Sequence, residues 1–191
     1  DAMEQVVASM ADFAINIVAP DGRYPPIGDT SAVKVPSNYY ATFGSIDGAV
    51  HPPRRAAFFS EGGYAILRDD PERDARQTYV LLCASHHGSY HKHNDDLSVL
   101  LYDGGWIIYE SGPFGYQYDR PECKHGYSSA AHSTLIVDNA NPTRGNLSPP
   151  GLVRLGDGAD ADESASASAV NRRLEGVVHV RRVGLSRSES R

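Results

Sequence analysis

The feature that most constrains the fold of this chain is a series of short apolar segments separated by turn residues. Glu61-Gly62-Gly63, Asp69-Asp70-Pro71 and Asp103-Gly104-Gly105 lie between such segments. Short apolar segments joined by tight turns favour antiparallel pairing. We therefore predict a mainly β fold with strands at residues 56–60, 64–68, 77–84, 97–102, 106–110, 133–137 and 176–183.

The remaining segments predict other structures. Residues 3–18 carry apolar side chains at helical spacing, and Pro20-Asp21-Gly22 ends the pattern. Residues 19–55 are rich in Pro, Gly, Ser and Tyr and predict a connecting segment with a short helix around residues 38–44. Residues 157–169 form a low-complexity run of Asp, Ala and Ser, which predicts either a solvated edge strand or a flexible loop.

Composition excludes several classes of function. The 191-residue chain has a net charge of -6 and no basic stripe, which argues against nucleic-acid binding. It contains no apolar run long enough for a membrane span, and its first four residues lack the pattern of a signal peptide. Its two cysteines, Cys83 and Cys123, make no disulfide framework. We expect Cys83, in an apolar segment, to be a buried small hydrophobe.

Histidines gather where one predicted strand ends and the next begins. Four of the eight histidines lie in residues 86–93, and Asp95 and Asp96 follow. In an extended backbone, His91 and His93 would point to one side and Lys92 to the other. Such a His-x-His pair can give zinc or a similar metal two nitrogen ligands. The alternative is that these histidines are simply solvated.

Further ligands are available on later segments. Glu110 and His132 could converge with His93 on one ion and leave an open position for water or a sugar oxygen. A cupin-type site would need Glu three or four residues after the His-x-His pair, and this chain has none there.

Several motifs in order resemble one known family. They are His91-x-His93-x-Asp95, the strand pattern LSVLLYDGGWIIYESG, the tyrosine-rich FGYQYDRPE and the later AAHSTLIVDN. YPPIGD and SEGGYAILRD precede them. Together these motifs resemble the heparinase II/III-like family over most of residues 22–139.

The resemblance implies an α/α toroid followed by an antiparallel β-sandwich. We then expect residues 1–20 to be the last helix of a truncated toroid, 21–55 a connecting segment and 56–191 an incomplete sandwich domain. Known enzymes of this family are polysaccharide lyases that act on uronic-acid polymers. An acidic polysaccharide or oligosaccharide is therefore the expected partner, and a periplasmic or secreted location the expected one.

The resemblance also implies roles for individual residues. His91 would face the substrate as the catalytic histidine. His93, Glu110 and His132 would bind zinc or another divalent metal, whose role would be mainly structural. Glu110 stands where the family commonly has Asp, and Ser133 replaces the usual Asn. The other catalytic residues would come from the toroid, so we expect the isolated chain to lack them.

Residues 111–129 predict a long loop that carries several tyrosines. Tyr116 and Tyr118 would bind substrate, by stacking on sugar rings or hydrogen bonding to them, or would only anchor the loop. Two other functions remain open: a non-catalytic carbohydrate-binding or structural sandwich with a structural metal, and a metal-dependent hydrolase.

Overall fold

The structure is a computed structural model of the chain. It describes residues 2–44, 53–72, 76–85, 91–142, 154–156 and 164–186. Its helices are α1 (Ala2–Ile17), α2 (Tyr39–Gly44), α3 (Pro121–Tyr127) and the 3-10 turn η1 (Ser129–Ala131). In the described part of the chain, no helix is both long and apolar enough to cross a membrane.

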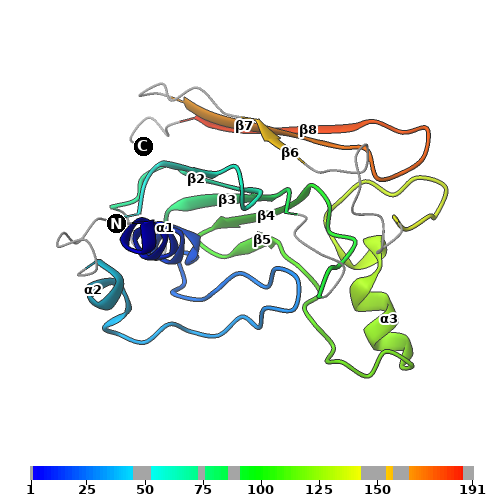
Figure 1. Cartoon of the computed structure of the whole chain (residues 1–191), viewed down its shortest axis with the longest axis horizontal. Helices are drawn as coiled ribbons and strands as arrows, with labels where there is room; N and C mark the ends of the chain where they lie inside the picture. Colours follow the sequence, from blue (N-terminus) through cyan, green and yellow to red (C-terminus); the bar gives the residue numbers. More distant parts are fainter. Residues whose placement is uncertain are drawn as a thin grey trace.

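Two antiparallel sheets form the body of the fold (Figure 1). The larger sheet has the order β1-β2-β3-β4-β5, so each strand pairs with its neighbour in sequence. Its strands are β1 (Ala56–Phe59), β2 (Tyr64–Arg68), β3 (Thr78–Cys83), β4 (Ser98–Asp103) and β5 (Trp106–Ile108). The smaller sheet has the order β6-β7-β8, with β6 (Arg154–Gly156), β7 (Ser164–Asn171) and β8 (His179–Ser186).

The larger sheet is buried on both faces because its side chains alternate. Ile66, Leu81 and Leu100 face one cluster, which also contains the end of α1. Ala65 and Leu82 face the other side, where they pack against residues of β7. Figure 1 shows the β6-β7-β8 sheet above the larger sheet and α1 beside the left ends of its strands. The predicted antiparallel β-sandwich preceded by one helix is confirmed.

The low-complexity run forms the middle strand of the smaller sheet. In β7, Ala165, Ala167 and Ala169 are buried, and the intervening serines are only partly covered. The strand pairs with β6 on one side and with β8 on the other. Of the two alternatives predicted for residues 157–169, the strand is confirmed over the described residues 164–169, but its predicted place at the sheet edge is wrong. Small alternating side chains suit a strand that packs closely onto a second sheet.

The C-terminal end of α1 is fixed by a buried arginine. The Arg68 guanidinium donates to the carbonyl oxygens of Asn16 and Val18 at 2.9 and 2.7 Å. The Tyr79 hydroxyl donates to the carbonyl of Ile17 at 3.0 Å. Side chains of the sheet thus satisfy the carbonyls that any helix leaves unpaired at this end.

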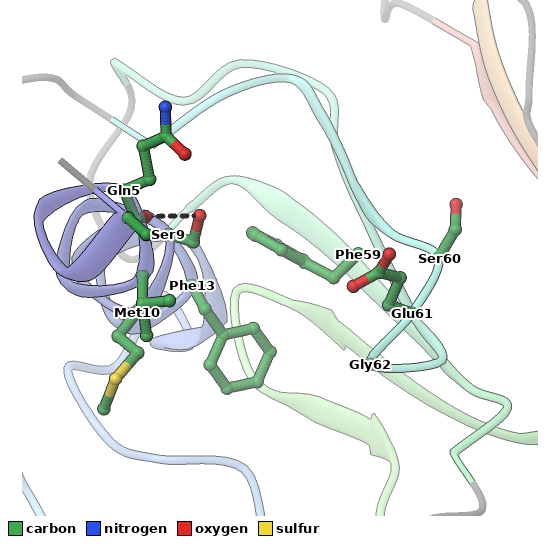
Figure 2. Close-up of a pocket in the computed structure, with 10 residues that line it drawn as sticks. Gln5, Ser9, Met10, Phe13, Phe59, Ser60, Glu61 and Gly62 are labelled. Atoms are coloured by element: carbon green, nitrogen blue, oxygen red, sulfur yellow. Dashed lines mark hydrogen bonds between the residues drawn. The ribbon is translucent and has the colours of Figure 1, made fainter.

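One face of α1, over residues 2–13, borders an apolar groove of about 820 Å³. Phe13 of the helix and Phe59 line it from two sides, together with the Glu61-Gly62 turn (Figure 2). Glu61 is the one titratable side chain among the described residues that line the groove. Among the described lining residues, Glu61 is thus the single acid, and no histidine stands beside it as in the histidine cluster.

Two local predictions fail downstream of β5. Residues 133–137 form no strand, because Asp138 and Asn139 adopt positive φ and turn the chain back, leaving a single bridge between Val137 and Ala140. The predicted loop at residues 111–129 contains α3, which starts with a proline at a position where the backbone N–H has no helical partner.

Candidate functional site

The His91–Asp96 segment leads into β4 through an irregular turn. His91 and Leu97 have positive φ values of 55° and 59°, which non-glycine residues rarely adopt. The backbone N–H of Asn94 donates to the carbonyl of Tyr127 at 3.1 Å, which ties the turn to the end of α3. The extended backbone assumed for His91-Lys92-His93 is therefore wrong at His91. The two imidazoles nevertheless meet the same partner.

That partner is Asp29, from the segment between α1 and α2. One carboxylate oxygen of Asp29 contacts His91 Nδ1, and the other lies 2.8 Å from His93 Nε2. The Tyr127 hydroxyl also donates to Asp29, at 3.0 Å. Burial tends to raise the pKa of Asp29, but hydrogen bonds from these three side chains lower it below its ordinary value.

Sequence analysis did not single out Asp29 as a site residue. Its one available signal was its place at the end of the YPPIGD motif. The side chain is 11% exposed, so a charged carboxylate is held largely away from water by partners that lie far along the chain. Such a placement is typical of a carboxylate that orients functional histidines.

The three predicted metal ligands are all buried in one neighbourhood. His132 Nδ1 contacts one oxygen of Glu110, and the rings of His93 and His132 lie 5.3 Å apart between centroids. Burial lowers the pKa of His132, but the hydrogen bond and the charge of Glu110 reverse this and raise it above 6.5. For His93 burial prevails, and its pKa is lowered.

Each of these residues has one buried polar atom that finds no hydrogen-bond partner among the described residues. The atoms are His93 Nδ1, His132 Nε2 and Glu110 Oε1. Leaving buried nitrogen and oxygen atoms unpaired is costly, and these atom types are those that bind zinc. The donor set therefore fits a divalent metal.

The present positions of these side chains, in contrast, do not form a metal site. Within the described ranges, no group of three or more His, Cys, Asp or Glu side chains already has the arrangement of a metal-binding cluster. Side-chain rotation can close a site, whereas an unpaired buried atom needs a partner. The three residues could therefore hold a metal after a small rearrangement.

His91, the predicted catalytic histidine, is open to solvent. Its side chain is 65% exposed and borders a pocket of about 470 Å³ together with Asp29 and His93. The Tyr116 ring meets the His91 ring edge-on at 5.7 Å. Tyr118 lies one step further, with its hydroxyl 3.5 Å from that of Tyr127. Both predicted substrate-binding tyrosines thus lie beside the histidines.

Charged residues of the cluster form a buried network. Lys92 is 7% exposed and pairs with Asp95 and Asp96. The carboxylate of Asp95 contacts the Lys92 ammonium group. Asp96 also accepts from Arg173 at 2.6 Å. This buried network fixes the turn that carries the histidines.

The predicted role of Cys83 holds. The residue is 1% exposed, and burial raises the pKa of its thiol to about 12, so the group stays neutral at physiological pH. His86 and His87, which belong to the histidine cluster of the sequence, lie outside the described residues.

Comparisons with known proteins agree with this architecture. In solved structures, the fold resembles a heparinase III, the BT4657 gene product, with a TM-score of 0.77 and 17% identity over 93% of this chain and 30% of that one. It also resembles the heparan sulfate lyase HepC from Pedobacter heparinus, with a TM-score of 0.73 and 20% identity over 91% of this chain and 29% of that one. No curated protein gave a significant match.

The chain spans about 30% of the length of these solved structures. Identities this low establish a shared fold and nothing more. The family comparison goes further, because the model of the heparinase II/III-like C-terminal domain matches residues 51–191. That range includes both sheets and the histidine cluster. The chain therefore belongs to the heparinase II/III-like family.

Proposed function

We propose that the chain forms part of a polysaccharide lyase that cleaves a uronic-acid-containing polysaccharide by β-elimination. The observation that carries this proposal is the exposed His91 ring, which borders a pocket and has Asp29 on its Nδ1 atom. Membership of the family supports it, as do the printed names of two similar structures, a heparinase III and a heparan sulfate lyase.

The proposed reaction removes the proton on C5 of a uronate. The bond between C4 and its oxygen then breaks, a C4–C5 double bond forms, and the departing oxygen takes up a proton. The C5 proton is weakly acidic until the neighbouring carboxylate charge is neutralised. His91 would act on the substrate side, either as the base or as a donor to that carboxylate.

Asp29 defines which atom of His91 is available. Because the carboxylate engages Nδ1, the other ring nitrogen, Nε2, would face the substrate. In this arrangement Asp29 is a positioning residue, since it would act through His91 and not on the sugar. Tyr116, beside the His91 ring, and Tyr118, beside Tyr127, would contact sugar rings of the bound substrate.

His93, Glu110 and His132 would hold a divalent metal, with zinc the best match to their donor atoms. Bound there, the ion would supply chiefly structural cross-linking of three separate segments. The turn that carries His91 would gain rigidity from it. Export to the periplasm or the exterior would bring the enzyme to its polymer.

The test is an assay for unsaturated product, made with the natural protein that contains this sequence. A lyase creates a sugar end that absorbs ultraviolet light, whereas a hydrolase creates a reducing end without unsaturation. We expect product from the wild type, none above background from His91→Ala, and normal product from His125→Ala, a control at an exposed histidine of α3. Saturable polysaccharide binding without any product would instead establish the non-catalytic binding function.

A further inference from the structure

A second polar pocket lies beside the histidines. It measures about 200 Å³ and is lined by Asn94, Tyr118, Lys124, Tyr127, Ser128 and Asn141. Tyr127 connects it to the larger pocket, because its hydroxyl donates to Asp29 and its ring lies 4.2 Å from that of His93. Lining residues of the two pockets are therefore in direct contact, so neighbouring units of one ligand chain could occupy both.

One residue that lines the smaller pocket, Asn94, carries an unsatisfied acceptor. Asn94 is 5% exposed, and its Oδ1 atom has no hydrogen-bond partner in the described residues. The backbone N–H of Asn94 is held by the Tyr127 carbonyl at 3.1 Å, so the residue is fixed in place. A buried acceptor without a donor costs free energy, which a hydroxyl or N–H group of a ligand would recover.

The rim of the pocket presents an unpaired cation. Lys124 is exposed on α3, and among the described residues its ammonium group has no carboxylate partner. Lys92, by contrast, is already neutralised by two aspartates. In a chain with a net charge of -6, Lys124 is thus a local group able to bind an anion.

We propose that this pocket is a subsite for one acidic sugar unit, adjacent to the unit that meets His91. The occupant would need an anionic group for Lys124 and a hydroxyl donor for Asn94, and an acidic sugar has both. The half-exposed Tyr118 ring would border the same unit. This inference rests on the proposed function, since it assigns the neighbouring unit of the same polymer.

The test is an NMR titration of the 191-residue chain with sodium glucuronate. Glucose serves as the neutral match, and inorganic sulfate serves as an anion without a sugar ring. We expect glucuronate to shift the amide signals of Asn94, Lys124 and Asn141 with saturation, and glucose to leave them unchanged. Lys124→Gln should weaken this binding about tenfold, the scale of one charged hydrogen bond. Lys34→Gln, the same change on the exposed connecting segment, should not weaken it.

Three results would overturn the subsite. They are unchanged glucuronate affinity in Lys124→Gln, shifts confined to the larger pocket, and sulfate binding as tight as that of glucuronate, which would indicate a plain anion site. Failure of the proposed function would look different: no unsaturated product would form, yet binding that depends on Lys124 would persist. Lyase activity with binding and KM unaffected by Lys124→Gln would retain the function and refute the subsite.

Discussion

Replacement of Arg173 by methionine tests how the histidine turn is held in place. The Arg173 and Asp96 side chains are 0% and 2% exposed, and their nitrogen and oxygen lie 2.6 Å apart. Without Arg173, Lys92 at 3.2 Å is the one remaining salt-bridge partner of Asp96 in the described part of the chain, and Lys92 is shared with Asp95. Breaking a buried pair costs about 3–5 kcal/mol, which for a domain of this size lowers the melting temperature by roughly 6–20 °C.

The assay is thermal and urea unfolding of the wild type, Arg173→Met, Asp96→Asn and the double variant. We expect the double variant to lose clearly less stability than the sum of the single variants, because it leaves no buried charge without its partner. Arg172→Met, a change at the exposed neighbour, controls for loss of positive charge. A cost below about 1 kcal/mol for Arg173→Met, or strict additivity, would refute the reasoning.

Three further predictions concern the site. Removing metal from the wild type with a chelator should lower its melting temperature. His93→Ala and His132→Ala should each lose both the metal and the stability that it provides. A metal-free protein as stable as the metal-loaded form would contradict this. Asp29→Asn should reduce lyase turnover about 10–100-fold while the fold persists, measured as kcat beside circular dichroism; unchanged kcat would exclude a positioning role. Burial raises the pKa of Asp95, but the charge of Lys92 is among the effects that bring it below 3.8. Asp95 should therefore stabilise the fold above pH 3.8 and cease to do so as the pH falls further, and Lys92→Met should shift acid unfolding to higher pH.

Local patterns accounted for most of the sheet. Alternating apolar residues and tight turns placed β1 to β5 to within a few residues, and helical spacing placed α1. The predictions failed where the local apolar pattern did not match the burial of the segment in the folded chain. The apolar Leu135 and Ile136 suggested a strand, yet both are over 40% exposed and no strand pairs with them in the described structure. The Ala- and Ser-rich sequence of β7 looked too polar for an interior strand. It forms one because its alternating alanines pack against the larger sheet, which the sequence pattern alone does not show.

The candidate site divides in the same way. The spacing of His91 and His93, and the donor types of Glu110 and His132, are properties of the sequence, and from them the sequence predicts a metal site. Whether His93, Glu110 and His132 bind one ion is a prediction that metal analysis will decide. Tyr116 contacts the His91 ring and Tyr118 lies near Tyr127, and their binding of sugar is likewise a prediction.

The sequence by itself determined the strand pattern, the N-terminal helix and the types of side chain available for chemistry. Only the tertiary structure brought Asp29 to His91 and His93, which lie 62 and 64 residues further along the chain. It likewise joined Arg173 to Asp96 across 77 residues. Such contacts have no period that a sequence displays, because they depend on how the connecting segment and the second sheet pack against the first. Local periodicity encodes the elements, whereas packing selects which charged groups share one buried space.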